Sequence, residues 1–152
     1  MDSQKRSITI EQPTWLIRFL ATYEQLGTDN LHLLEEVYHS AVEFQDPIHV
    51  VNGLNDLQSY FHNLYTNLTE CHFEITEVIH NDTDAAIYWD MNYRHPKLNN
   101  GKTIRVEGHS RLKGYADKVH YHRDYLDVGA MLYEQIPILG WFIKQVKRRA
   151  SK

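Results

Sequence analysis

The chain has 152 residues, of which 42% are hydrophobic and 24% charged, and this composition is typical of a globular protein with one core. The formal net charge of −4 hides an asymmetry, because five of the 16 basic residues lie in the last nine positions, where no acidic residue occurs. The rest of the chain has 11 basic and 20 acidic residues, a net charge of −9. This excess of acid excludes a general nucleic-acid-binding surface, and we expect no nucleic-acid partner.

The N-terminal segment, residues 1–12, is polar and shows no apolar signal sequence. No run of about 18 apolar residues occurs anywhere, so we expect no membrane span and a cytoplasmic location. Cys71 is the single cysteine and has no identified base, which predicts a small packing residue.

Helical periodicity dominates the first half of the chain. Apolar residues recur at helical spacing over residues 13–26, 31–41 and 54–68, which predicts three amphipathic helices. The Asp46-Pro47 step ends the second of these, since a residue before proline avoids helical geometry.

The period then changes from about 3.6 to 2, which predicts strands. Alternation of apolar and polar residues covers 73–79, 87–93, 106–112 and 119–127, and the last two are joined by a turn at 114–117. Helices followed by a meander predict an α+β fold in which N-terminal helices pack on a strongly curved antiparallel sheet. We expect this arrangement to form a cone with an internal pocket.

Two local motifs support a family resemblance. They are F-Q-D-P-I-H-V-V-N-G at Phe44–Gly53 and the strand-turn-strand that begins G-H-S-R-L-K-G at Gly108. With the order of elements, residues 15–128 resemble the nuclear transport factor 2-like superfamily, especially its SnoaL-like and ketosteroid-isomerase-like branch. The resemblance implies a domain over 13–128, followed by a C-terminal amphipathic basic extension at 129–152.

The resemblance also implies roles for single residues. In ketosteroid isomerases an aspartate in an Asp-Pro turn moves a proton at carbon, and Asp46 looks like its counterpart. His109 stands where those isomerases have a second aspartate. In limonene-epoxide-hydrolase-like members, the water-activating positions correspond to Glu107, His109 and Asp124, and only Asp124 keeps the residue type.

The strand pattern itself predicts a cluster of polar side chains. A turn centred on residues 115–116 would place His109 opposite His122 and Glu107 opposite Asp124, with Cβ atoms about 4.5–5.5 Å apart. A histidine beside two carboxylates suits proton transfer near neutral pH. The candidate catalytic residues are therefore His109, Asp124, Glu107 and Asp46, and the candidate substrate-binding residues are Tyr88, Asp90, His122 and Leu126.

Other interpretations of the same residues stay open. The face with the polar side chains could be solvated or form a dimer contact. The opposite, more apolar face of the strands would then lie under the helices. Asp46 could act only in shaping the turn before Pro47, without a catalytic role. The series His120, His122 and Asp124 could hold a metal ion, although the preferred hypothesis contains no metal and no cofactor.

We therefore expect a small hydrophobic ligand, a homodimer, and proton-transfer chemistry of the isomerase, dehydratase, cyclase or hydrolase type. The alternative is a non-catalytic ligand-binding or dimeric association module, which a pocket that is closed, or filled by Trp89 and Tyr93, would favour. The apolar and basic residues of 129–152 suggest either weak contact with a membrane surface or a simple packing helix.

Overall fold

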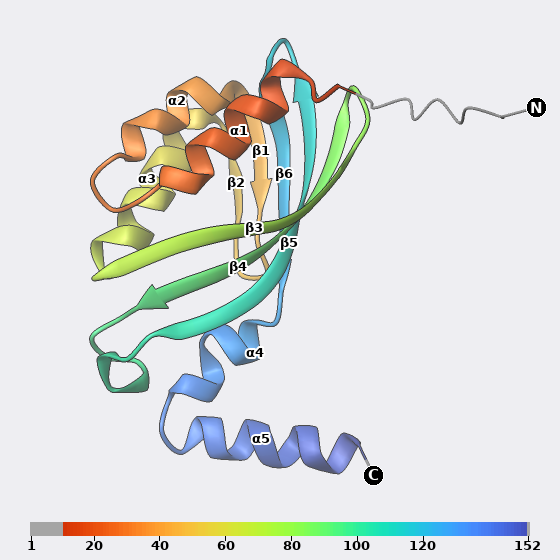
Figure 1. The fold of residues 1–152 in the computed structure, drawn as a ribbon. Coiled ribbons are helices and arrows are strands. Elements are labelled where there is room, and N and C mark those ends of the chain that lie inside the picture. The colour runs from red at the N-terminus through yellow and green to blue at the C-terminus, as the bar shows by residue number, and fades with distance from the viewer. Residues whose placement is uncertain (1–10, 152) are drawn as a thin grey trace, which may run out of the picture.

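The structure is a computed structural model that describes residues 11–151. Three α-helices cover one side of a curved sheet, and two more α-helices lie beyond the opposite end of that sheet (Figure 1). In chain order the elements are α1 Thr14–Gln25, η1 Leu31–Leu33, α2 Leu34–Val37, β1 Tyr38–Gln45, β2 Val50–Asn52, α3 Leu54–Thr66, β3 Glu70–His80, β4 Asp84–Arg94, η2 Asn99–Gly101, β5 Ile104–Tyr115, β6 Lys118–Leu126, α4 Val128–Met131, η3 Tyr133–Gln135 and α5 Leu139–Ala150. The predicted α+β class is confirmed.

The six strands form one sheet in the order β2-β1-β6-β5-β4-β3. Four of the five neighbouring pairs are antiparallel, but β1 runs parallel to β6, with Phe44 beside His122. The prediction of a wholly antiparallel sheet is wrong at this pair. Its physical reason is the long connection through α3 and β3–β5, because a parallel neighbour needs such a crossover.

The predicted second helix is correct only as far as Val37. Tyr38, which the helical pattern places on the same stripe, begins strand β1 instead. Val42 and Phe44 alternate with exposed residues in that strand and are buried. Here pairing with β6 outweighs a short helical pattern, because the helix propensity of a few residues is weak compared with tertiary contacts.

The core lies between helices α1–α3 and the concave face of the sheet (Figure 1). Leu16 of α1, Leu57 of α3 and Ile87 of β4 are almost completely buried there. Burial of such side chains stabilises the fold by about 1.5–3 kcal/mol each. Because the sheet curls around them, the helices and strands together form the predicted cone.

The C-terminal segments follow β6 at the end of the sheet remote from α1 (Figure 1). Asp127 caps α4, because its side chain accepts a hydrogen bond from the Ala130 amide. The Tyr93 hydroxyl donates to the carbonyl of Met131 and so ties α4 to β4. None of the helices in the described residues is long and apolar enough to cross a membrane.

Candidate functional site

The hairpin between β5 and β6 decides which side chains face the core. Its turn consists of Ala116 and Asp117, both with positive φ, and Tyr115 pairs with Lys118. Two positive φ angles in a two-residue loop are typical of a type I′ turn. A further register shift lies between Lys113 and Gly114. As a result, Ser110 lies opposite Asp124.

The predicted pairing of this hairpin is wrong by three residues. His109 lies opposite Tyr125, and His122 lies opposite Leu112. The turn is centred one residue later than predicted, and the bulge adds the remainder of the shift. An odd shift moves side chains to the other face of a strand, so His109 and Asp124 lie on opposite faces of the sheet.

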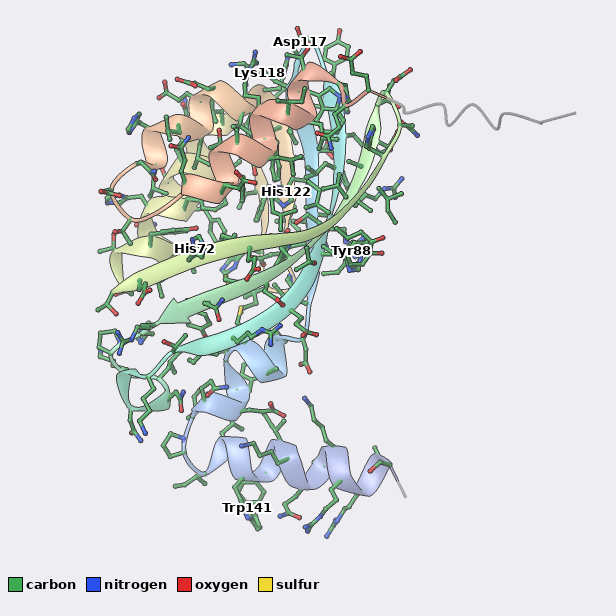
Figure 2. The ribbon with its side chains drawn as sticks, viewed as in Figure 1. His72, Tyr88, Asp117, Lys118, His122 and Trp141 are labelled. Atoms are coloured by element: carbon green, nitrogen blue, oxygen red, sulfur yellow. The ribbon has the colours of Figure 1, made fainter. Side chains whose placement is uncertain are left out.

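Three polar residues of the hairpin lie on the concave face, under the helices. His122 is 1% exposed and Ser110 is 3% exposed, while the Asp124 side chain keeps 18% exposure. His122 lies between the helices and the sheet, whereas Tyr88 projects from the other side (Figure 2). Buried polar groups of this kind need hydrogen-bond partners.

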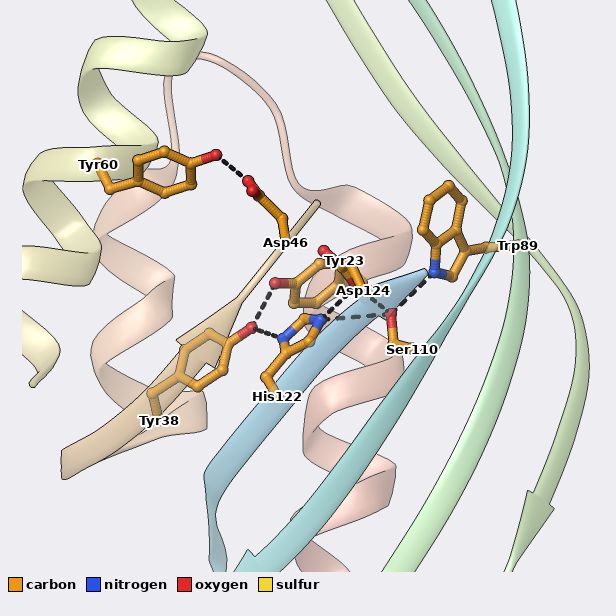
Figure 3. Close-up of polar contacts among 8 residues, drawn as sticks. All are labelled: Tyr23, Tyr38, Asp46, Tyr60, Trp89, Ser110, His122 and Asp124. Carbon is orange, nitrogen blue, oxygen red and sulfur yellow. Dashed lines mark hydrogen bonds and ion pairs between the residues drawn. The ribbon is translucent and has the colours of Figure 1, made fainter. Parts of the chain in front are cut away.

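A continuous chain of hydrogen bonds joins these residues to two tyrosines (Figure 3). The Tyr23 and Tyr38 hydroxyls lie 2.5 Å apart, and the Tyr38 hydroxyl lies 2.6 Å from Nδ1 of His122. On the other side of the ring, Nε2 lies 2.6 Å from Oδ1 of Asp124. One histidine thus links two buried phenols to one carboxylate.

Ser110 supports the same carboxylate oxygen. Its hydroxyl lies 2.5 Å from Oδ1 of Asp124 and accepts a hydrogen bond of 2.9 Å from Nε1 of Trp89. It also lies 3.2 Å from Nε2 of His122. Ser110 donates to Asp124, because an ionised carboxylate can only accept.

Proton positions follow from the chemistry of the partners. An ionised Asp124 only accepts, so Nε2 of His122 carries the proton that points to it. In a neutral ring Nδ1 then accepts from Tyr38, and Tyr23 donates to the Tyr38 oxygen. Both ring nitrogens of His122 therefore have a partner.

The two tyrosines hold their protons firmly. Burial raises the pKa of Tyr23 and the pKa of Tyr38 far above the usual range of a phenol. The loss of water around each ring is the main cause, because it disfavours the phenolate. Both phenols therefore act as neutral hydrogen-bond donors to the chain that ends at Asp124.

Asp124 is the member of this network that faces free space. Both of its hydrogen bonds reach Oδ1, and within residues 11–151 no hydrogen bond reaches Oδ2. The carboxylate lines a cavity of about 20 Å³ between α1 and the sheet. The other lining residues are mostly apolar: Phe19, Tyr23, Phe73, Ile75, Ile87, Trp89 and Ser110. A space of this size holds about one water molecule.

Asp46 lies on the same side of the sheet as Asp124. Phe44 of β1 pairs with His122 of β6, and two residues further along these parallel strands come Asp46 and Asp124. Oδ1 of Asp46 accepts from the amides of Ile48 and His49, at 2.7 and 2.6 Å, which is the predicted turn geometry.

The second oxygen of Asp46 accepts a hydrogen bond from the Tyr60 hydroxyl of α3 (Figure 3). Burial, with this carboxylate as a further cause, raises the pKa of Tyr60 far above the usual range. Asp46 and Tyr60 form a second, partly buried polar pair. Within residues 11–151 no hydrogen bond joins this pair to the network of His122 and Asp124.

The convex face carries the remaining predicted residues. The rings of Tyr88, His109 and Tyr125 lie in a row: Tyr88 is tilted against His109 with centroids 5.3 Å apart, and His109 stacks on Tyr125 at 4.8 Å. Tyr88 is 38% exposed, and all three rings line an open groove of about 600 Å³. The predicted proximity of His109 to Asp124 is therefore wrong.

Glu107 and Asp90 also belong to the convex face. They lie opposite each other on β5 and β4, and Nη2 of Arg105 lies 2.7 Å from Asp90 and 3.4 Å from Glu107. The Glu107 side chain is 78% exposed. Leu126, in contrast, pairs with Gly108 and packs partly buried against the core. The predicted pairing of Glu107 with Asp124 is wrong.

The series predicted as an alternative metal site is not assembled in one place. The register shift leaves His120 outside the regular pairing, and its ring lies edge-on to Tyr115, away from Asp124. Over residues 11–151, no group of three or more histidine, cysteine or acidic side chains is placed to hold a metal ion.

Sequence reasoning missed Tyr23, Tyr38 and Ser110 as members of the network. The two tyrosines fit helical apolar stripes and were read as packing residues. Ser110 alternates with the apolar residues of its strand. This pattern was a usable signal, because a small polar residue at an inward position predicts a buried hydrogen bond.

Comparison with known proteins agrees with this architecture. The model of the SnoaL-like domain family matches residues 19–122. Among curated proteins, no significant sequence match is found. Solved structures are similar in fold, with sequence identities too low to transfer a function.

Three solved structures illustrate the likeness. An NTF2-like protein of unknown function from Burkholderia pseudomallei has a TM-score of 0.71 and 12% identity, over 80% of this chain and 96% of that one. A protein with a ketosteroid isomerase-like fold from Catenulispora acidiphila, in complex with trimethylamine, has a TM-score of 0.69 and 12% identity, over 82% and 93%. An LEH-like epoxide hydrolase from M. tuberculosis has a TM-score of 0.66 and 9% identity, over 78% and 86%. The chain belongs to the SnoaL-like domain family, and its fold is similar to that of an NTF2-like protein.

Proposed function

We propose that this chain binds a small apolar molecule with one polar group between α1 and the sheet, and that Asp124 exchanges a proton with it. The observation that carries this proposal is the state of the two Asp124 oxygens. Oδ1 is held by His122 and Ser110, whereas Oδ2 has no hydrogen bond within residues 11–151. A general base needs one oriented oxygen that the substrate can reach.

The surroundings of Asp124 suit a proton transfer at carbon. Phe73, Ile75 and Trp89 line the cavity and would exclude water from an apolar substrate. In the proposed step Oδ2 of Asp124 takes a proton from a carbon beside a carbonyl group. The electron pair of the C–H bond forms a carbon–carbon double bond, and the π pair of the carbonyl group moves to its oxygen, which gives an enolate. Return of the proton to another carbon completes an isomerisation.

The rest of the network would hold the base in place. His122 cannot rotate freely, because both ring nitrogens are hydrogen-bonded and the ring stacks on Tyr38. Orientation of a catalytic group within a fraction of an ångström is worth several kcal/mol of barrier. His122, Tyr38 and Ser110 are therefore positioning residues in this proposal.

A substrate larger than water needs more room than the cavity of about 20 Å³ offers. Phe19 and Tyr23 belong to the single helix α1, which forms one wall of the cavity. A shift of α1 away from β3 and β4 would widen the cavity without breaking a strand pair. We propose that binding involves this movement.

The test is exchange of substrate protons for deuterium. A cyclic enone such as cyclohexenone is incubated in heavy water with the full chain, and NMR follows the loss of protons beside the carbonyl. We expect catalysed exchange, slowed at least about 100-fold by Asp124→Asn. A wild-type rate equal to that of Asp124→Asn, for a panel of enones of increasing size, would reject the proposal.

A second candidate function is a non-catalytic association module, and the small cavity favours it. The convex groove with Tyr88, His109 and Tyr125 would then be the contact between two copies. Ultracentrifugation distinguishes this candidate: it predicts a dimer that Tyr88→Glu dissociates, with no enone exchange. The homodimer and the cytoplasmic location are still predictions.

A further inference from the structure

Helix α5 turns an apolar stripe to solvent. Leu139, Phe142 and Val146 recur at the i, i+3, i+7 spacing that places side chains on one face of a helix. They are 41%, 56% and 66% exposed, respectively. An amphipathic helix of a globular domain normally buries such a stripe, so this one lacks a covering surface within residues 11–151.

The side of α5 that carries Gly140 and Lys147 faces its own domain instead. The Gly140 backbone approaches the Glu134 carbonyl so closely that an added Cβ would lie 2.4 Å from that oxygen. Nζ of Lys147 lies 2.9 Å from carboxylate oxygens of both Asp127 and Glu134. These contacts fix the rotation of the helix and keep the apolar stripe outward.

Three cations of α5 have no acidic partner. Within residues 11–151, Lys144, Arg148 and Arg149 make no ion pair, in contrast to Lys147. The domain body is strongly acidic, so positive charge is concentrated at this one end of the molecule. An anionic surface is the complement of such an end.

Two aromatic rings complete this surface. Trp141 is 60% exposed and lies edge-on to Phe142, with ring centroids 4.9 Å apart. Trp141 projects from α5 on the side away from the sheet (Figure 2). Tryptophan is favoured at the boundary of a bilayer, because its ring is apolar and its N–H is polar.

We propose that α5 binds the surface of an anionic lipid bilayer, with Phe142 and Val146 inserted between headgroups and the cations beside lipid phosphates. An anionic bilayer offers both an apolar layer and negative charge to this helix. A second copy of the chain would meet the same face with the same unpaired cations, which repel each other. Charge therefore favours the bilayer over self-association.

Vesicle binding by the full chain tests the proposal. Vesicles of phosphatidylcholine alone and of phosphatidylcholine mixed equally with phosphatidylglycerol are sedimented with the protein at low and high salt. We expect binding only to the anionic vesicles and release by salt. Arg148→Gln with Arg149→Gln should weaken binding about 30-fold, and Phe142→Ser should also reduce it.

Tryptophan fluorescence reports the contact directly. Trp15 and Trp89 are buried, at 4% and 6% exposure, so solvent-exposed emission comes from Trp141. Anionic vesicles should shift that emission to the blue. Trp141→Phe should remove the shift while the protein still sediments, since phenylalanine keeps an apolar ring at this position.

Ile17→Ser is the matched control, because Ile17 is a 52% exposed apolar residue on helix α1. It should leave vesicle binding unchanged. Absence of binding to anionic vesicles at low salt, or equal losses in Ile17→Ser and Phe142→Ser, would overturn the proposal. A dimer in free solution that Val146→Asp dissociates would overturn it in favour of a second copy.

Discussion

The two faces of the sheet carry the same kinds of side chain and use them differently. On the concave face His122 and Asp124 are tied to buried tyrosines through short hydrogen bonds. On the convex face His109 lies between the rings of Tyr88 and Tyr125, and nearby acids pair with a solvated arginine. Burial, rather than residue type, therefore decides which histidine belongs to a connected network.

The largest expected contrast is between the two histidines. His122→Ala removes one hydrogen bond from Tyr38 and one from Asp124 and opens a cavity, so the free energy of unfolding should fall by about 3–5 kcal/mol. His109→Ala on the convex face should change it by less than about 1 kcal/mol. Urea denaturation measures both, and equal losses would show that the two faces do not differ.

A smaller difference in the free energy of unfolding is expected between variants of one tyrosine on each face. Tyr38→Phe removes the hydroxyl between Tyr23 and His122, which should lower the free energy of unfolding by about 1–3 kcal/mol. Tyr125→Phe is the matched change on the convex face and should stay within about 0.5 kcal/mol of wild type. If Tyr38→Phe is neutral in thermal and urea unfolding, the hydrogen-bond chain does not stabilise the fold.

Thiol reactivity compares the two faces of strand β3. Burial raises the pKa of Cys71 to about 11, so its thiol is almost fully protonated at pH 8. The thiolate is the reactive form, hence labelling by a disulfide reagent should be slow and should accelerate as pH rises toward that value. In a Cys71→Ser chain, His72→Cys on the exposed side should react much faster; similar rates would contradict the burial difference.

The smallest expected effect belongs to the ion pairs of the convex face. Nη2 of Arg105 contacts Asp90 and Glu107, but the arginine is largely solvated. Solvent and salt screen such pairs, so Arg105→Gln should leave the urea midpoint almost unchanged, and added salt should remove any difference. A large loss of stability would mean that this face is better ordered than its exposure indicates.

The order of helices and strands was predictable from the sequence, because the spacing of apolar residues follows the buried face of each element. The first and third helices and strands β4 and β5 follow their apolar patterns. In β3 and β6 one extra residue breaks the alternation, so Ile79 of β3 is exposed. Strand β1 was not predictable, since its first residue, Tyr38, also fits the stripe of the preceding helix. Its pairing with β6 spans most of the chain, and no local pattern encodes such a distant contact.

The site was predictable in part for the same reason. Asp124 and His122 were selected from their alternation along one strand, which the structure keeps. The partner strand was misaligned because the turn at Ala116 and Asp117 contains no glycine, and the bulge at His120 leaves no clear local signal. One short turn thus moved His109 and Glu107 away from the residues they were predicted to join.

The central claim is that proton-transfer chemistry belongs to the concave face, and enone proton exchange in paired variants tests it most directly. Asp124→Asn should abolish the exchange that the wild-type chain catalyses, while His109→Ala should retain at least about half of it. Far-ultraviolet circular dichroism confirms that both variants are folded. Loss of exchange in His109→Ala, with exchange retained in Asp124→Asn, would contradict the account.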